Sequence, residues 1–132
     1  MKTLKRILLV EDNQYDAELT LAALSDAGLG NDVFVVRDGA EALAYLRNAW
    51  EAGQASGLPA VVLLDLKLPD STDLNLLRRL RRLAPNSRVI LMTAHGSADV
   101  LEEALRAGAF RAVGKPFDLQ DMVALVRDAV AA

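Results

Sequence analysis

The chain contains no cysteine and few aromatic residues, which make up only 5% of its 132 residues. The absence of cysteine excludes a disulfide framework and thiol chemistry. The low aromatic content predicts a core packed from aliphatic side chains. The single histidine, His95, has no second histidine with which to share a metal ion, so a histidine-based metal site is not expected.

Long apolar runs are also missing. No uninterrupted apolar segment exceeds five residues, so none is long enough to cross a membrane. The first ten residues begin with positive charge and then turn apolar, but an acidic segment follows where a signal peptide would need a small-residue cleavage site. The net charge of −3 gives no electrostatic reason to expect nucleic acid. We therefore expect a cytoplasmic protein that binds neither membranes nor nucleic acid.

The residues that are present form a regular pattern typical of one domain over residues 1–132. Runs rich in Val, Ile and Leu predict strands at Arg6–Val10, Val33–Val36, Ala60–Leu64, Arg88–Met92 and Phe110–Val113. Apolar residues at helical spacing predict helices within 11–28, 37–53, 74–84, 97–108 and 118–131. This alternation predicts an α/β fold with a parallel sheet covered on both faces. Right-handed crossovers favour the doubly wound strand order 2-1-3-4-5, with the last strand at an edge.

In such a sheet, ligands bind beyond the carboxyl ends of the strands. The expected strand ends carry three carboxylates, a hydroxyl and an amine, which belong to Glu11, Asp12, Asp65, Thr93 and Lys115. Three close carboxylates repel one another unless a dication binds them, and Mg²⁺ prefers oxygen ligands. A carboxylate can also attack phosphorus, and phosphoryl transfer then needs a metal, a cation and a hydrogen-bond donor. The set therefore predicts a phosphoryl-transfer site.

Each of these residues has a plainer interpretation when taken alone. Asp12 or Asn13 would suit the N-cap of the first helix. Thr93 is an ordinary strand-end residue, and Lys115 an ordinary solvated lysine. Only their combination at matching strand ends favours a functional site.

The segments ILLVEDN, VVLLDLKLPD, VILMTAHG and GAFRAVGKPFD together resemble the receiver domain of two-component response regulators, over essentially the whole chain. The resemblance implies a flavodoxin-like (βα)₅ fold. It implies that Asp65 accepts a phosphoryl group from a histidine kinase or a histidine phosphotransfer protein. It also implies that Mg²⁺ binds to Asp65, to Asp12 directly, to Glu11 through water and to the backbone carbonyl of Lys67. Such a domain catalyses only its own phosphorylation and dephosphorylation.

By the same resemblance, Thr93 donates a hydrogen bond to the phosphoryl group and Lys115 pairs with it. The chain departs from the family three positions before this lysine, where Ala112 replaces an aromatic residue that swings inward on activation. Phe110 lies two residues earlier and is expected on the opposite face of the strand. We therefore expect activation without the usual aromatic switch.

Several alternatives remain open at this point. The first half of the chain is similar to single-domain regulators paired with bacterial phytochromes, and the second half to receivers of nitrogen-regulatory activators. The chain is therefore a stand-alone regulator or a receiver excised from a longer transcription activator. A small aspartyl-phosphate phosphatase is a further alternative, but those enzymes carry a second acid where this chain has Lys67. A degenerate docking module is disfavoured by the intact acids, threonine and lysine.

The output surface is expected on the fourth helix, the fifth strand and the fifth helix, beside Thr93 and Lys115. Outward residues of both signs there would let two copies pair as a homodimer. These residues are Asp99, Arg106, Arg111, Asp121, Arg127 and Asp128. The basic run over residues 78–82 is interpreted as a solvated helix face.

Overall fold

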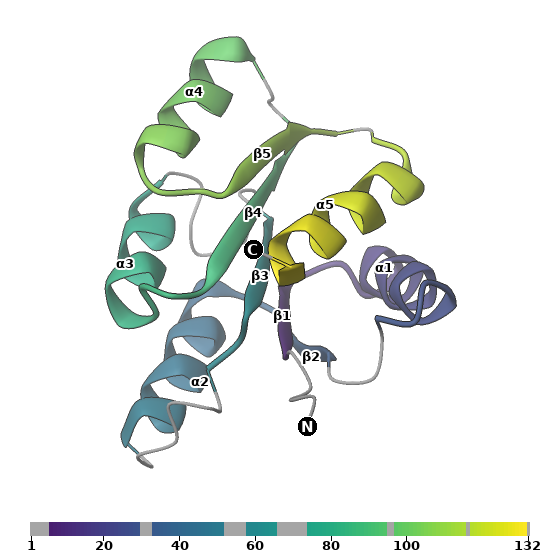
Figure 1. Cartoon of the computed structure of the whole chain (residues 1–132). Helices are drawn as coiled ribbons and strands as arrows, with labels where there is room; N and C mark the ends of the chain where they lie inside the picture. Colours follow the sequence, from purple (N-terminus) through teal and green to yellow (C-terminus); the bar gives the residue numbers. More distant parts are fainter. Residues whose placement is uncertain are drawn as a thin grey trace.

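The computed structural model describes residues 6–29, 33–51, 58–65, 74–94, 97–115 and 117–131. The strands are β1 (Ile7–Val10), β2 (Val33–Val36), β3 (Val61–Asp65), β4 (Arg88–Thr93) and β5 (Arg111–Gly114). The helices are α1 (Gln14–Asp26), α2 (Gly39–Glu51), α3 (Asn75–Leu83), α4 (Ala98–Arg106) and α5 (Leu119–Ala131). Strands and helices alternate along the chain, as the sequence pattern predicts (Figure 1).

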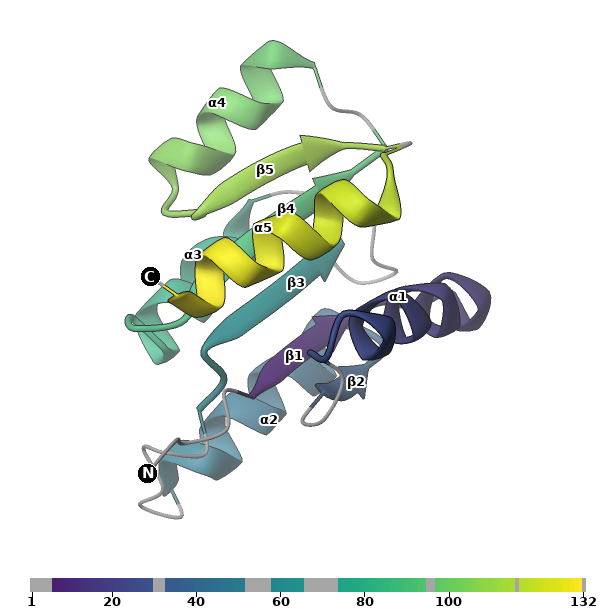
Figure 2. The same ribbon diagram turned by 45° about the vertical axis from the view of Figure 1, so that its right-hand side comes forward.

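The five strands form one parallel sheet in the order β2-β1-β3-β4-β5. Figure 2 shows the strands side by side and running in one direction. This is the predicted flavodoxin-like topology, and it confirms that β5 is an edge strand. The order reverses between β1 and β3, which places the expected ligand site at the carboxyl ends of these two strands.

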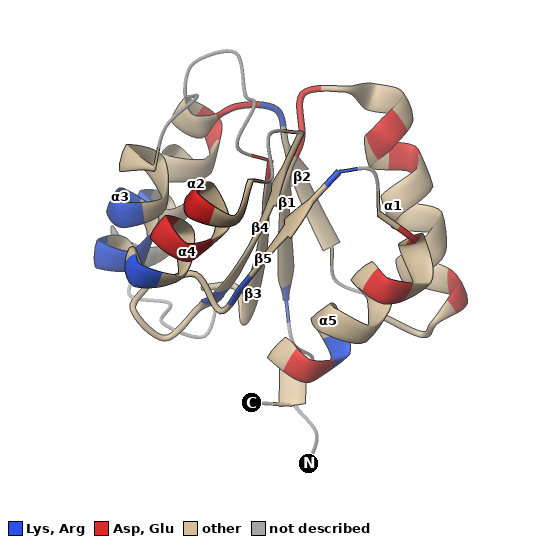
Figure 3. Ribbon diagram, turned by 90° about the horizontal axis from the view of Figure 1, so that it is seen from above, with Lys and Arg blue, Asp and Glu red and all other residues tan. Residues whose placement is uncertain are grey.

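Two apolar clusters lie on opposite faces of the sheet. Helices α2, α3 and α4 cover one face, where leucines such as Leu46, Leu77 and Leu80 pack on alternate residues of the inner strands. Helices α1 and α5 cover the other face, with Leu24 and Val126 at its centre (Figure 3). The inner strands are buried on both faces, which explains why their sequences are continuous apolar runs. No helix in the described part of the chain is long and apolar enough to span a membrane.

The helix ends follow local sequence signals. Asn13 is the N-cap of α1, and its side chain accepts a hydrogen bond from the backbone N–H of Asp16 at 2.9 Å. Asp118 caps α5 in the same way, by accepting from the N–H of Gln120 at 2.8 Å. Gly28 follows α1 with a φ of 76°, a left-handed conformation that glycine adopts without strain.

Four strands differ by one residue from the predicted apolar runs: β3 and β5 are displaced by one residue, β4 is one residue longer, and β1 begins one residue later. Asp65 is the last residue of β3 and Thr93 the last residue of β4, one residue after the apolar run ends in each case. The β3–β4 ladder continues to the pair Asp65–Met92, so Asp65 belongs to the rigid sheet and not to the following loop. Strand β5 begins at Arg111, so Phe110 precedes it.

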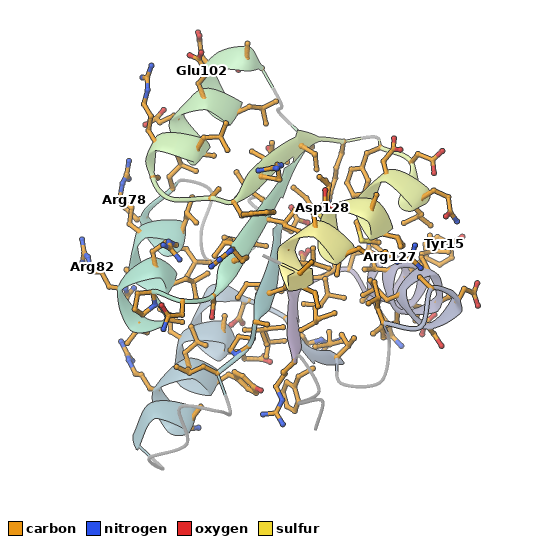
Figure 4. All side chains as sticks on the ribbon, in the orientation of Figure 1. Tyr15, Arg78, Arg82, Glu102, Arg127 and Asp128 are labelled. Carbon is orange, nitrogen blue, oxygen red and sulfur yellow. The ribbon has the colours of Figure 1, made fainter. Side chains whose placement is uncertain are left out.

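Arg127 is exposed on α5, as predicted, but it lies on a different side of this helix from the surface shared with α4 and β5. Its guanidinium donates a hydrogen bond to the carbonyl of Ala27 at 3.1 Å, directly after α1. Arg127 therefore lies on the side of α5 that faces α1 (Figure 4). The sequence does not contain this information, because α1 and α5 meet only through the tertiary fold.

Candidate functional site

The parallel register brings the predicted residues to one edge of the sheet. Asp65, the last residue of β3, lies opposite Met92 of β4, and Thr93 follows as the last residue of β4. Glu11 comes directly after β1 and Lys115 directly after β5. Because all five strands run in the same direction, these residues share the carboxyl edge.

Asp65 forms a close ion pair with Lys115. The Asp65 side chain is almost fully buried, and the ammonium Nζ of Lys115 donates to its Oδ2 at 2.9 Å. The same ammonium lies 3.9 Å from Oε1 of Glu11. An ionised carboxylate in a buried position is costly without a partner, and Lys115 is that partner here. The pair explains how a carboxylate is tolerated at the end of a core strand.

Glu11 is a buried acid whose pKa is raised. It is only 4% exposed, and burial raises the pKa of its carboxyl to about 7, with a further contribution from the negative charge of Asp65. Lys115 and a 3.3 Å hydrogen bond from the N–H of Asn13 act in the opposite direction. A raised pKa is expected for a buried carboxylate that shares a site with other carboxylates.

Lys115 is held in its cationic form. Burial alone would lower the pKa of its ammonium group, but the hydrogen bond and charge of Asp65, together with Glu11 and Asp16, outweigh it and leave the pKa raised. A lysine that stays charged beside a buried carboxylate can stabilise negative charge that develops on a neighbouring phosphoryl group.

Three acids are placed so that one metal ion can bind them. Glu11, Asp12 and Asp65 each offer a carboxylate oxygen, and these oxygens all lie within 4.8 Å of one another. Oxygen ligands of a single Mg²⁺ lie at most about 4.2 Å apart, twice the Mg–O distance, so only a small contraction is needed. The donor set, made of hard anionic oxygens, fits Mg²⁺.

Asp12 has no helix-capping role. Sequence patterns left open whether Asp12 or Asn13 caps α1, and the structure gives this role to Asn13. Asp12 is exposed at the rim of the acid cluster. Its carboxylate is therefore accessible to a hydrated cation.

A pocket of about 430 Å³ adjoins the ion pair on the α1 and α5 side of the sheet. Its lining consists of Glu11, Asp16, Leu19, Thr20, Met92, Ala94, Lys115, Phe117 and Leu119. The sequence analysis did not single out Asp16 or Leu19, because only tertiary packing brings α1 next to the end of β5. Tyr15, which is 69% exposed, and Leu19, which is 40% exposed, make the outer face of α1 partly apolar (Figure 4).

Of the other residues named in the sequence analysis, the structure describes Thr93. Thr93 is buried at the end of β4, and its carbonyl accepts a hydrogen bond of 2.6 Å from the backbone N–H of Lys115. A backbone hydrogen bond thus joins Thr93 to Lys115. Lys67 and His95 lie outside the described residues.

The expected separation of Phe110 and Ala112 is confirmed, but not by strand alternation. Ala112 packs against the α2–α3–α4 cluster and Phe110 against the α1–α5 cluster. Residues two apart within a strand share a face, so the separation arises because Phe110 precedes β5. Two guanidinium groups lie over the ring of Phe110, with Cζ of Arg111 at 4.4 Å and Cζ of Arg88 at 5.9 Å from its centroid.

Comparisons with known proteins agree with this geometry. The family model of the response regulator receiver domain matches residues 7–127. Sporulation initiation phosphotransferase F of Bacillus subtilis is 32% identical over 123 residues, which cover 93% of this chain and 89% of that protein. The DNA-binding transcriptional regulator NtrC of Escherichia coli is 36% identical over 94% of this chain, which spans only 24% of that protein.

A solved structure gives the same result. The bacteriophytochrome response regulator RtBRR superposes with a TM-score of 0.78 and is 40% identical, over 96% of this chain and 78% of that one. The sheet order, the acid cluster and the matching family model lead to one conclusion. This chain belongs to the response regulator receiver domain family, whose members are phosphoacceptors in two-component signalling.

Proposed function

We propose that Asp65 is the residue of this chain that receives a phosphoryl group from a histidine kinase or a histidine phosphotransfer protein. The observation that carries the proposal is the buried ion pair: Asp65 ends β3 with its Oδ2 2.9 Å from the ammonium of Lys115, inside a cluster of three acids. Receiver domains in general take phosphoryl groups from such donors and are signalling domains, not conventional enzymes.

In the proposed reaction, a carboxylate oxygen of Asp65 attacks the phosphorus of a phosphohistidine. The new O–P bond replaces the N–P bond, and the imidazole leaves as the donor's histidine. Lys115 exchanges its contact with Asp65 for one with a phosphoryl oxygen, and the hydroxyl of Thr93 donates to another. In the proposed dephosphorylation, a water oxygen attacks the phosphorus and the O–P bond to Asp65 breaks, which releases inorganic phosphate and restores the carboxylate.

Receiver domains bind Mg²⁺ at an acidic pocket, and we assign this role here to the acid cluster. Asp12 and Asp65 would bind the ion directly, Glu11 through water, and Lys67 through its backbone carbonyl. When bound, Mg²⁺ supplies positive charge that offsets the negative charge of the acids and of the phosphoryl oxygens.

The donor has to approach over the carboxyl edge of the sheet, where the pocket beside Lys115 opens. The partly apolar face of α1 and this pocket offer contact area next to Asp65. The 40% identity to a bacteriophytochrome response regulator makes phytochrome-type kinases the first donors to test. We also propose a cytoplasmic location, which is consistent with the family, and no direct contact with nucleic acid or membrane.

The phosphatase alternative is not favoured, because the matched relatives are receivers and not phosphatases. The sequence analysis left open a stand-alone regulator and a receiver excised from a longer protein. Relatives of both lengths are found. Sporulation initiation phosphotransferase F is spanned over 89% of its length and NtrC over 24%.

The proposal is tested by phosphotransfer from a panel of autophosphorylated histidine kinases, including phytochrome-type kinases. Radiolabel is expected to move from kinase to receiver only with Mg²⁺ present. A parallel reaction uses acetyl phosphate, a small phosphodonor that needs no docking surface on the protein. Failure of both kinds of donor to label the protein would overturn the proposal.

Activation is expected to proceed without an aromatic rotamer switch, because Ala112 has no side chain that can swing. NMR spectra of the protein with and without beryllofluoride, a phosphoryl mimic, should show the largest changes in backbone chemical shift at the end of β4, near Thr93. The ring signals of Phe110 should change little, since its contacts to Arg88 and Arg111 lie at the opposite end of β5. A dominant change at Phe110 would show that this ring has replaced the missing aromatic.

We also propose a phosphorylation-strengthened homodimer through α4, β5 and α5. Leu105 is 49% exposed on α4, and the same three elements carry exposed charges of both signs, including Asp99, Arg111 and Asp121. A two-fold contact lets opposite charges meet, and exposed pairs contribute only about 0–1 kcal/mol each. Sedimentation should therefore show a weak, salt-sensitive dimer that beryllofluoride strengthens and that Arg111→Glu weakens. A monomer under every condition would exclude this interface.

A further inference from the structure

Helix α3 presents a row of exposed arginines. Arg78, Arg79 and Arg82 are exposed, whereas Leu76, Leu77 and Leu80 form the buried side of the helix. None of the nine residues of α3 is acidic. Figure 4 shows Arg78 and Arg82 extending outward from α3, and Figure 3 shows the basic positions gathered on this helix. We call these three residues the arginine face.

The fourth arginine of α3 has a structural role that the other three lack. The Nη1 of Arg81 donates to the carbonyls of Pro85 and Ser87 at 2.9 and 2.7 Å. Its side chain also packs against Gly108 at the end of α4. These bonds fix the turn between α3 and β4. The contacts of Arg81 therefore give this arginine a structural role, in contrast to the three residues of the arginine face.

The arginine face is barely used within the molecule. Arg78 lies 3.9 Å from Glu103 of α4, and both side chains are largely exposed, at 44% and 62%, so this pair contributes little. Within the described part of the chain, neither Arg79 nor Arg82 has an ion pair or a side-chain hydrogen bond. Two guanidinium groups are therefore exposed without a partner among the residues that the structure describes.

This arrangement opposes helix stability. Arg78 and Arg82 are four residues apart and Arg79 and Arg82 three, spacings at which like charges repel on a helix surface. Mixed charges at the same positions would stabilise α3. Positive charge also predominates in the surrounding part of the chain. Residues 74–114 carry seven arginines and only three acids, in a chain whose net charge is −3. An anionic surface opposite the arginine face would remove the repulsion.

The acids next to the arginine face limit which anions can bind to it. On its α4 side it meets acids, because Glu103 contacts Arg78, and Glu102 and Asp99 belong to the same helix. Large polyanions such as duplex DNA or an anionic membrane would have to cover these acids as well. The three arginines span slightly more than one turn of helix, about 6 Å along its axis. Carboxylates one helical turn apart on a second helix have the same spacing.

We propose that the arginine face of α3 binds a carboxylate-rich helical segment of a partner protein. The planar guanidinium groups pair with carboxylates in two-point contacts. Helix α3 covers the sheet face opposite to α1 and α5. The acidic partner can therefore bind while a phosphodonor occupies the edge near α1. This surface is separate from the phosphorylation site, so the inference does not depend on the proposed reaction.

A fluorescein-labelled helical peptide with glutamates at every fourth position tests the proposal by fluorescence anisotropy. Binding at low salt is expected for this peptide and absent for the same peptide with glutamine in place of glutamate. The double variant Arg79→Glu/Arg82→Glu should weaken binding by roughly tenfold or more. The control Arg106→Glu/Arg127→Glu makes the same change in net charge on α4 and α5 and should bind as the native chain does.

Circular dichroism establishes that both double variants are folded. Equal weakening in the two double variants would show a response to net charge alone and overturn the proposal. Failure of the glutamate peptide to bind would also overturn it. So would tighter binding of a DNA duplex or of phosphatidylserine vesicles, because either result would assign the arginine face to a different anion.

Discussion

Asp65→Asn is expected to abolish phosphorylation completely. The amide of asparagine has the shape of the carboxylate but lacks the nucleophilic oxygen, so no acyl phosphate can form. The variant should remain folded, because Lys115 keeps Glu11 as a counter-charge 3.9 Å away. The loss of a buried acid also removes repulsion from Glu11, whose pKa is raised in part by Asp65.

The measurement is mass spectrometry after incubation with acetyl phosphate and Mg²⁺. The native protein should acquire an acid-stable, base-labile adduct on the peptide that contains Asp65, and the variant none. Asp26→Asn, which changes an exposed acid at the far end of α1, is the matched control and should be phosphorylated normally. An adduct that persists in Asp65→Asn would show that another residue is the phosphoacceptor.

The affinity for Mg²⁺ is expected to increase roughly tenfold between pH 6 and pH 8. The cause is Glu11, whose pKa is raised to about 7 in the metal-free site. A cation favours the ionised carboxylate, so below pH 7 binding has to displace a proton, and above pH 7 it does not. Calorimetric titrations in two buffers of different ionisation enthalpy should detect this proton release at pH 6 and little release at pH 8.

Two variants separate the roles of the acids. Glu11→Gln should remove most of the pH dependence, because it removes the titrating group. Asp12→Asn should weaken binding at every pH and keep the pH dependence, since Asp12 is the exposed acid of the proposed site and Glu11 is still present. A larger loss of affinity in Glu11→Gln than in Asp12→Asn would contradict this division of roles.

The same raised pKa has a consequence for stability. Glu11 binds a proton more tightly in the folded chain than in the unfolded chain, where its pKa is near 4.5. Its contribution to stability is therefore fully present below pH 4.5 and is lost as the pH rises through about 7. Without Mg²⁺ the melting temperature should fall between pH 6 and pH 8, and saturating Mg²⁺ should reverse this trend.

Sequence patterns were sufficient for the fold and for the main residues of the site. The alternation of apolar runs and helical segments determines the α/β class, and right-handed crossovers leave few strand orders. Parallel strands then bring their ends together, so Glu11, Asp65 and Lys115 can be grouped before any distance is known. Regular structure makes such inferences possible, because its geometry repeats from one residue to the next.

Properties that depend on packing between helices were not predictable in the same way. Asp16 and Leu19 line the pocket only because α1 lies beside the end of β5. Arg127 faces α1 because the two helices of that layer meet. The pKa of Glu11 depends on the number of atoms that exclude water from its carboxyl, a quantity absent from any local pattern.

The N-cap of α1 separates two tasks that lie on adjacent residues. Since Asn13 anchors the start of the helix, the backbone does not rely on the charge of Asp12. A cation could then bind to and leave the proposed site without partial unwinding of α1. By the same reasoning, we expect a substitution at Asp12 to change the affinity of the proposed cation site while the architecture of the domain remains intact.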